Sequence, residues 1–178
     1  QVRDFRWLWA NATVHSLGQN MEILAQGWLV LETTGSPFWI GAVAGARGVG
    51  MVISAPLGGV MADRLDRRWS VLVLQLARAL LLLGLGLDAL FGDTGLWRIL
   101  GAVFLIGIFQ GLYLPTNNSL IFDIVGERRV LNAMAARATS FNLARILGSL
   151  AAGAMIVVFS TSSVFLVVGG SMLIGPLL

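Results

Sequence analysis

Polar residues recur along one side of the first long apolar stretch, residues 7–31, at spacings of three and four. This row comprises Asn11, His15, Gln19, Glu22 and Gln26. Residues three and four apart lie on the same side of an α-helix, so all five share one face. A shorter row with the same spacing falls in residues 97–121 and comprises Gln110, Tyr113 and Asn117. Such side chains bind ligands and one another by hydrogen bonds, and a carboxylate can also hold a proton or a cation.

Three charged residues fall deep within apolar stretches. At 1.5 Å per residue, Glu22 lies about 22 Å along the first stretch and Arg145 about 21 Å along the fifth, while Arg47 lies about 14 Å down the second from the opposite end. All three are therefore expected at a similar depth, where an unpaired charge is costly. Glu22 is the only carboxylate near this depth, so it is the candidate for binding a proton or a cation. A structural ion pair with an arginine is the alternative.

The elements that carry these residues are too apolar for a water-soluble domain. Hydrophobic residues make up 57% of the 178 residues and charged residues 12%, with a mean hydropathy of +0.83, whereas soluble domains carry about 25% charged residues. All but the last of the long apolar stretches exceed the ~20 residues that a helix needs to cross a bilayer. The sequence therefore predicts an all-α, polytopic transmembrane helical bundle. The six expected helices are residues 7–31, 38–62, 70–91, 97–121, 131–158 and 163–178.

The arginines are distributed unevenly between the two sides of this bundle. Seven fall on one side, against Arg98 alone on the other. Arginine-rich loops stay in the cytoplasm, so the N-terminus is expected there, and an aromatic belt is expected where the tryptophans fall near helix ends. Arg78, nearer the cytoplasmic side of its helix, is expected to snorkel to the surface or to pair with Asp123. The seven are Arg3, Arg6, Arg64, Arg67, Arg68, Arg128 and Arg129.

Residue usage excludes several kinds of chemistry. The chain has no Cys, no Lys and one His, which excludes disulfides, thiolate metal sites, His-rich metal sites and catalytic Ser/Lys pairs. All twelve basic residues are arginines without a basic tract, so no nucleic-acid partner is expected. We predict neither enzymatic activity nor a cofactor. The first residue is Gln1 and an apolar run reaches Leu178, so we expect the chain to be part of a longer protein.

An Arg-rich motif connects the second and third expected helices. The segment from Gly58 to Arg68 resembles the loop G-x-x-x-D-R-x-G-R-[RK] of the major facilitator superfamily, with Asp66 where that family commonly has Gly. The resemblance implies the first six of twelve helices, built as two inverted three-helix repeats, and a cytoplasmic gating role for the motif. The alternative is an arginine cluster that only orients the protein in the membrane. The matching residues are Gly59, Asp63, Arg64, Arg67 and Arg68.

Other segments look like the enterobactin-exporter-like and macrolide-efflux-like branch of that family. They are residues 31–37, 62–68, 132–133 and 142–148. Two motifs of its drug antiporters are altered. Gly107 stands where R-x-x-Q-G has its Arg, and residues 148–153 lack the Pro of G-P-x-x-G-G.

The resemblance implies a secondary active transporter, a proton-coupled exporter of amphipathic small molecules that works by alternating access in the plasma membrane, expected to be a bacterial inner membrane. Its implied partners are the lipid bilayer, a small-molecule substrate, protons and a C-terminal half of the same chain. A non-catalytic structural or assembly membrane subunit is the alternative, and a membrane-embedded enzyme is the less favoured third possibility. The polar rows either line a central cavity, as the first and fourth helices do in the resembling fold, or only join helices by hydrogen bonds. The candidate cavity residues are Glu22, Arg47, Arg145, His15, Gln19, Gln26, Gln110, Tyr113 and Asn117.

Overall fold

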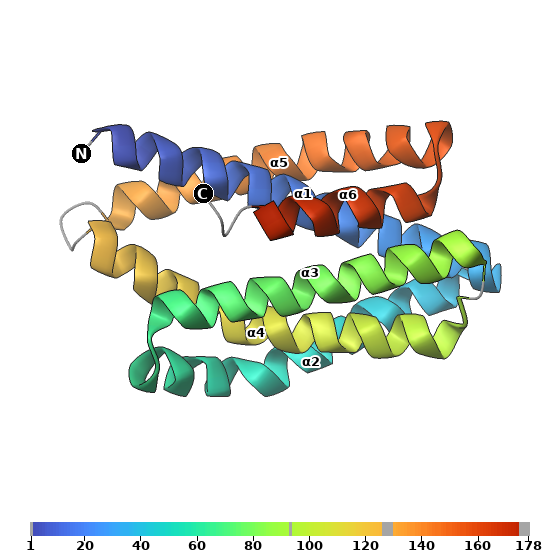
Figure 1. Ribbon diagram of the computed structural model, residues 1–178, viewed down its shortest axis with the longest axis horizontal. Helices are drawn as coiled ribbons and strands as arrows, with labels where there is room; N and C mark the ends of the chain where they lie inside the picture. Colours follow the sequence, from blue (N-terminus) through green and yellow to red (C-terminus); the bar gives the residue numbers. More distant parts are fainter. Residues whose placement is uncertain (1, 93, 126–129, 175–178) are drawn as a thin grey trace.

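The computed structural model describes residues 2–92, 94–125 and 130–174, with the side chains of residues 15–61, 64–66, 69–92, 94–117 and 138–173. These residues form an all-helical bundle without strands (Figure 1). The predicted fold class, a helical bundle with membrane-spanning helices, is therefore confirmed. The helices are α1 (Val2–Thr34), α2 (Pro37–Arg64), α3 (Arg67–Phe91), α4 (Leu96–Val125), α5 (Val130–Val158) and α6 (Thr161–Ile174).

Short connections make successive helices antiparallel. The α1–α2 connection contains Gly35 at a positive φ of 65°, a conformation that glycine adopts without steric cost, and Pro37 then begins α2. Gly92 has the same role after α3, with a φ of 73°. Figure 1 shows the α1–α2, α3–α4 and α5–α6 connections at one end of the bundle, with the α2–α3 connection at the other.

The helix contacts repeat between the two halves of the chain. The most extensive pairs are α2 with α4, α1 with α5 and α3 with α6, followed by α3 with α4 and α1 with α6. Exchanging α1, α2 and α3 with α4, α5 and α6, in that order, leaves this set of pairs unchanged. Since α1 and α4 run in opposite directions (Figure 1), the contacts have the symmetry of two inverted three-helix repeats.

The outer surface is apolar. Within the described part of the chain, four helical segments are long and apolar enough to cross a membrane: Pro37–Met61, Trp69–Phe91, Leu96–Asn117 and Ala138–Val158. Helices α1 and α6 are not among these segments. The described part of α1 carries the polar row, and the apolar part of α6, Thr161–Leu173, is shorter. Large apolar side chains such as Val52 and Leu150 are exposed, as are Trp28, Trp69 and Trp97. Such a surface suits lipid, with tryptophans at the interface.

Glycines bring α2 and α4 into main-chain contact. A Cβ atom on Gly107 would overlap the carbonyl group of Arg47, and one on Gly50 would overlap the main chain of α4. The Ser54 hydroxyl donates a hydrogen bond of 2.8 Å to the carbonyl of Ile108 across this contact. This close packing fixes the position of Arg47 relative to the polar row on α4.

Candidate functional site

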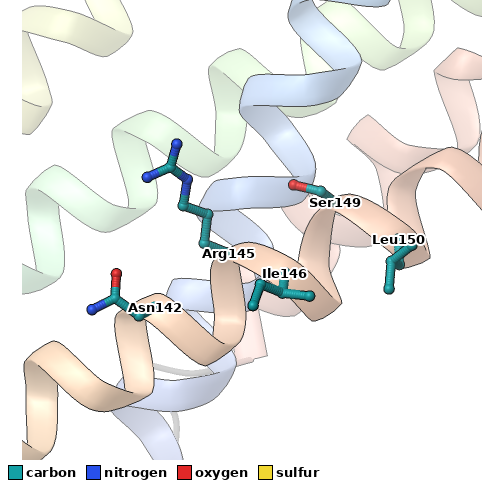
Figure 2. Close-up of a pocket in the computed structure, with 5 residues that line it drawn as sticks. All are labelled: Asn142, Arg145, Ile146, Ser149 and Leu150. Atoms are coloured by element: carbon teal, nitrogen blue, oxygen red, sulfur yellow. The ribbon is translucent and has the colours of Figure 1, made fainter.

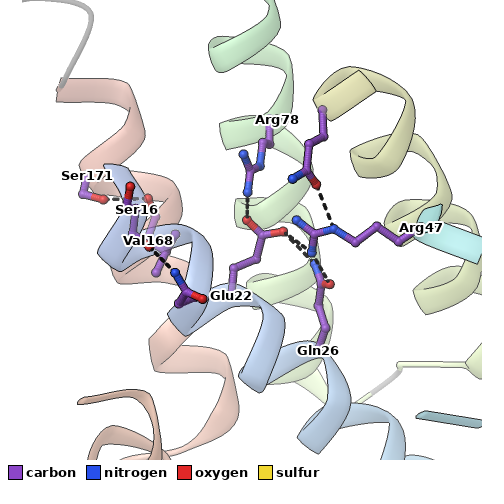
Figure 3. Close-up of polar contacts among 9 residues, drawn as sticks. Ser16, Glu22, Gln26, Arg47, Arg78, Val168 and Ser171 are labelled. Atoms are coloured by element: carbon purple, nitrogen blue, oxygen red, sulfur yellow. Dashed lines mark hydrogen bonds and ion pairs between the residues drawn. The ribbon is translucent and has the colours of Figure 1, made fainter. Parts of the chain in front are cut away.

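A buried carboxylate at the centre of the bundle lies between two arginines from different helices. Glu22 of α1 is fully buried and forms an ion pair of 2.5 Å with Arg78 of α3 and one of 3.2 Å with Arg47 of α2. The arginine side chains are 5% and 12% exposed, respectively. Figure 3 shows both guanidinium groups directed at the same carboxylate. Charges this deep are retained only where partners offset their desolvation.

Two glutamines complete this cluster. Gln26 lies one turn after Glu22 on α1 and donates a hydrogen bond of 2.9 Å to it, while its own oxygen accepts one of 3.0 Å from Arg47. Gln110 of α4 accepts a hydrogen bond of 2.9 Å from Nε of Arg47. The side chains of four helices, α1 to α4, therefore meet at one point. We call Glu22, Gln26, Arg47, Arg78 and Gln110 the central cluster.

A second group of polar side chains lies one to two helical turns along α1, α3 and α4 from the central cluster. The ring of His15 lies against that of Tyr113, with centroids 5.4 Å apart and a tilt of 33°. Gln75, three residues before Arg78 on α3, donates a hydrogen bond of 3.4 Å to the Tyr113 hydroxyl. The polar rows of α1 and α4 therefore face each other, and α3 adds a short row of its own. We call His15, Gln75 and Tyr113 the aromatic group.

The central cluster carries more positive than negative charge. It contains the guanidinium groups of Arg47 and Arg78 but a single carboxylate, Glu22. Nη2 of Arg47 and Nε of Arg78 are buried and have no hydrogen-bond acceptor in the described part of the chain. A buried donor on a charged group without an acceptor is energetically costly. The described residues therefore leave two donors of this positively charged cluster unsatisfied.

Arg145 lies apart from this cluster. It is exposed on α5 beside a pocket with a volume of about 540 Å³, and among the described residues it forms no ion pair. Figure 2 shows Arg145 and Asn142 extending from the same side of α5, with Ser149 one turn further along. Of the three charges expected at one depth, the structure thus joins Glu22 and Arg47 only. The pocket-lining residues are Asn142, Arg145, Ile146, Ser149 and Leu150.

Comparison with known proteins identifies the family. A sequence profile of the Major Facilitator Superfamily matches residues 8–178. The chain belongs to the Major Facilitator Superfamily. It is 26% identical over 165 residues to the uncharacterized MFS-type transporter YfiS of Bacillus subtilis (strain 168), an alignment that covers 92% of this chain and 38% of that protein. The chain therefore spans well under half the length of this relative.

Asp66, the departure from the superfamily loop, begins a helix. It precedes α3, and its carboxylate accepts a hydrogen bond of 3.3 Å from the main-chain N–H of Trp69. This is the N-cap arrangement, in which an aspartate satisfies a free donor of the first helical turn. Of the motif residues, Gly59 is half-buried and Arg64 is exposed. The side chains of Asp63, Arg67 and Arg68 lie outside the described residues, so their gating role stays a prediction.

Gly107, the departure from the antiporter motif on α4, faces the main chain of α2. A side chain at this position would overlap the carbonyl of Arg47. The guanidinium group that binds Gln110 comes instead from Arg47 itself. In this member of the superfamily the positive charge beside Gln110 is therefore carried by α2.

The expectation that Arg78 snorkels to the surface was wrong, because Arg78 is 4% exposed and binds Glu22. The side chain of Asp123, its other expected partner, lies outside the described residues. The depth of Arg78 along its helix did not indicate a contact with Glu22, because a guanidinium group can lie several ångströms along the helix from its Cα. The sequence analysis also missed Gln75. The signal was present, because Gln75 and Arg78 are spaced three apart on an apolar helix and so form a short polar row. Gln19 and Asn117 are half-buried and form no hydrogen bond with the central cluster, and Asn11 lies outside the described side chains.

Proposed function

We propose that the chain is the N-terminal half of a secondary active transporter that exports amphipathic small molecules in exchange for protons across the bacterial inner membrane. Membership of the Major Facilitator Superfamily supports transport. The observation that carries the proposal is the ion-paired carboxylate of Glu22 at the meeting point of four helices. Buried ionisable groups inside a membrane bundle are costly and mark ion or substrate pathways.

Alternating access gives this carboxylate a means of coupling. Its two arginines come from α2 and α3, whereas Glu22 belongs to α1, which packs chiefly with α5. A small shift between these helix groups would lengthen the ion pairs and let Glu22 take up a proton. The return shift would restore the ion pairs of Glu22 and release the proton. The Arg-rich motif after α2 would act as a latch that holds the bundle in one state, with the N-terminus in the cytoplasm.

Substitution of Glu22 by Gln tests this proposal. The full-length Glu22→Gln protein, reconstituted in liposomes, should lose efflux driven by a proton gradient while it keeps energy-independent substrate exchange, since the neutral form is fixed. Both rates are measured on the same preparation, with Glu32→Gln as the matched control. Glu32 is the other carboxylate among the described side chains of α1, and it binds Trp28 and Thr161.

Undiminished uphill efflux by folded Glu22→Gln protein would remove Glu22 from the coupling mechanism. A reduced folding yield, with proton coupling kept in the protein that does fold, would identify Glu22 as a structural partner of the two arginines. Proton coupling would then have to reside elsewhere in the full-length chain.

A further inference from the structure

The central cluster has the composition of an incomplete anion site. Glu22 offers two carboxylate oxygens to two guanidinium groups, and both oxygens are engaged. Nη2 of Arg47 and Nε of Arg78 remain buried without an acceptor among the described residues. The free donors therefore belong to positively charged groups and come from both arginines.

We infer that the central cluster binds the anionic group of a ligand, a carboxylate or an anion of similar size, through Arg47 and Arg78. This inference rests on the proposed transport function and narrows its substrate class to anions. A planar guanidinium group presents paired N–H donors that match carboxylate oxygens. An anion would also offset the one positive charge that the carboxylate of Glu22 leaves unbalanced, which neither a cation nor a neutral ligand would do.

Arg47 is held ready for such a ligand. Its Nε binds Gln110 and its Nη1 binds Gln26 and Glu22, which fixes the plane of the guanidinium group and leaves Nη2 free. Figure 3 shows this side chain crossing from α2 toward Glu22. Groups fixed in place before a ligand arrives lose less conformational entropy when it binds.

The aromatic group favours an anion attached to a ring. Tyr113 lies one turn from Gln110 on α4, Gln75 lies one turn from Arg78 on α3, and His15, whose ring lies against that of Tyr113, is about two turns from Glu22 on α1. Aromatic faces stack on the rings of ligands. An aromatic carboxylate, with its charge at Arg47 and its ring toward Tyr113, fits this order of side chains.

Benzoate binding to the purified full-length protein in detergent tests the inference, with benzamide as the neutral compound of the same shape and chloride as the inorganic anion. Ligand-dependent thermal stabilisation gives the affinities without any gradient. Benzoate should stabilise the wild-type protein and benzamide should not. Arg47→Gln should weaken benzoate binding about 10- to 100-fold, the range for a lost hydrogen bond to a charged group. Arg47→Lys, which keeps the positive charge, should lose less benzoate affinity than Arg47→Gln.

Arg98→Gln is the matched control, because Arg98 is an exposed arginine paired with Asp88 outside the cluster. It should bind benzoate as the wild type does. If chloride stabilises the protein and competes with benzoate, the site accepts inorganic anions as well as carboxylates. If chloride has no effect, the site is selective for carboxylates. Both results support the inference.

Equal stabilisation by benzoate and benzamide, no stabilisation by benzoate or chloride, or unchanged benzoate affinity in Arg47→Gln would each overturn the inference. The wild-type comparison needs no variant, so it stands even if Arg47→Gln does not fold. Anion binding without transport would overturn the proposed function alone. Uphill transport by a protein that binds no anion would overturn this inference alone.

Discussion

Removal of the Glu22 carboxylate should destabilise the protein mainly through Arg78. In Glu22→Ala, Arg47 keeps its hydrogen bonds to Gln26 and Gln110, whereas Arg78 loses the one partner it has among the described residues. A buried charge stranded in this way costs about 3–5 kcal/mol. Glu22→Ala should therefore lower the free energy of unfolding by about that amount.

The double variant Glu22→Ala/Arg78→Met removes the stranded charge. It should recover about 2–4 kcal/mol of the loss, whereas Glu22→Ala/Arg47→Met should recover less than about 1 kcal/mol, because Arg47 was not stranded. Reversible unfolding of the full-length protein in mixed detergent micelles measures all four free energies. Equal recovery by the two double variants, or a loss below about 1 kcal/mol in Glu22→Ala alone, would refute this reasoning.

Two further predictions concern packing and orientation. Gly107→Ala should lower the free energy of unfolding by about 1–3 kcal/mol, since its Cβ meets the carbonyl of Arg47. Gly101→Ala in the same helix, where a Cβ meets nothing within 4 Å, should instead be neutral or stabilise by up to about 1 kcal/mol, and the same unfolding assay compares them. Single cysteines at Gly92 and Asp66, in a background without other accessible cysteines, should react with a membrane-impermeant thiol reagent from opposite sides of the membrane. Labelling of both from the same side would contradict the proposed orientation.

The sequence predicted the helices because membrane spans are long and mostly apolar. Lipid contact requires apolar residues around most of each helix, so the stretches stand out without any knowledge of the contacts between them. The polar row on α1 was also visible, since a spacing of three and four defines one face. Its meeting with the row on α4 could not be established in the same way, because periodicity gives the direction of a side chain within its own helix only.

The partners within the central cluster could not be predicted from depth. Arg145 was expected at the depth of Glu22 because both fall at a similar distance along their helices, but Arg145 is exposed on α5 and lies apart from the central cluster. Arg78 was assigned to the cytoplasmic side, yet its long side chain reaches Glu22. The sequence also did not show that Arg47 of α2 supplies the positive charge beside Gln110 in place of a residue at position 107. The contact of Gly107 with the Arg47 carbonyl depends on how α2 and α4 cross. Rotation and crossing of helices are set by packing, which a single sequence does not specify.

The unbalanced charge of the central cluster has an electrical consequence. Moving one elementary charge through a membrane potential of 100 mV changes the free energy by about 2.3 kcal/mol. In the proposed alternating-access cycle, an empty site with two guanidinium groups and an ionised Glu22 would carry one positive charge through part of that field. A voltage negative inside the cell would then draw this empty site toward the cytoplasm. A bound monovalent anion cancels the charge and makes the loaded step insensitive to voltage, so the membrane potential alone would favour outward movement of the anion.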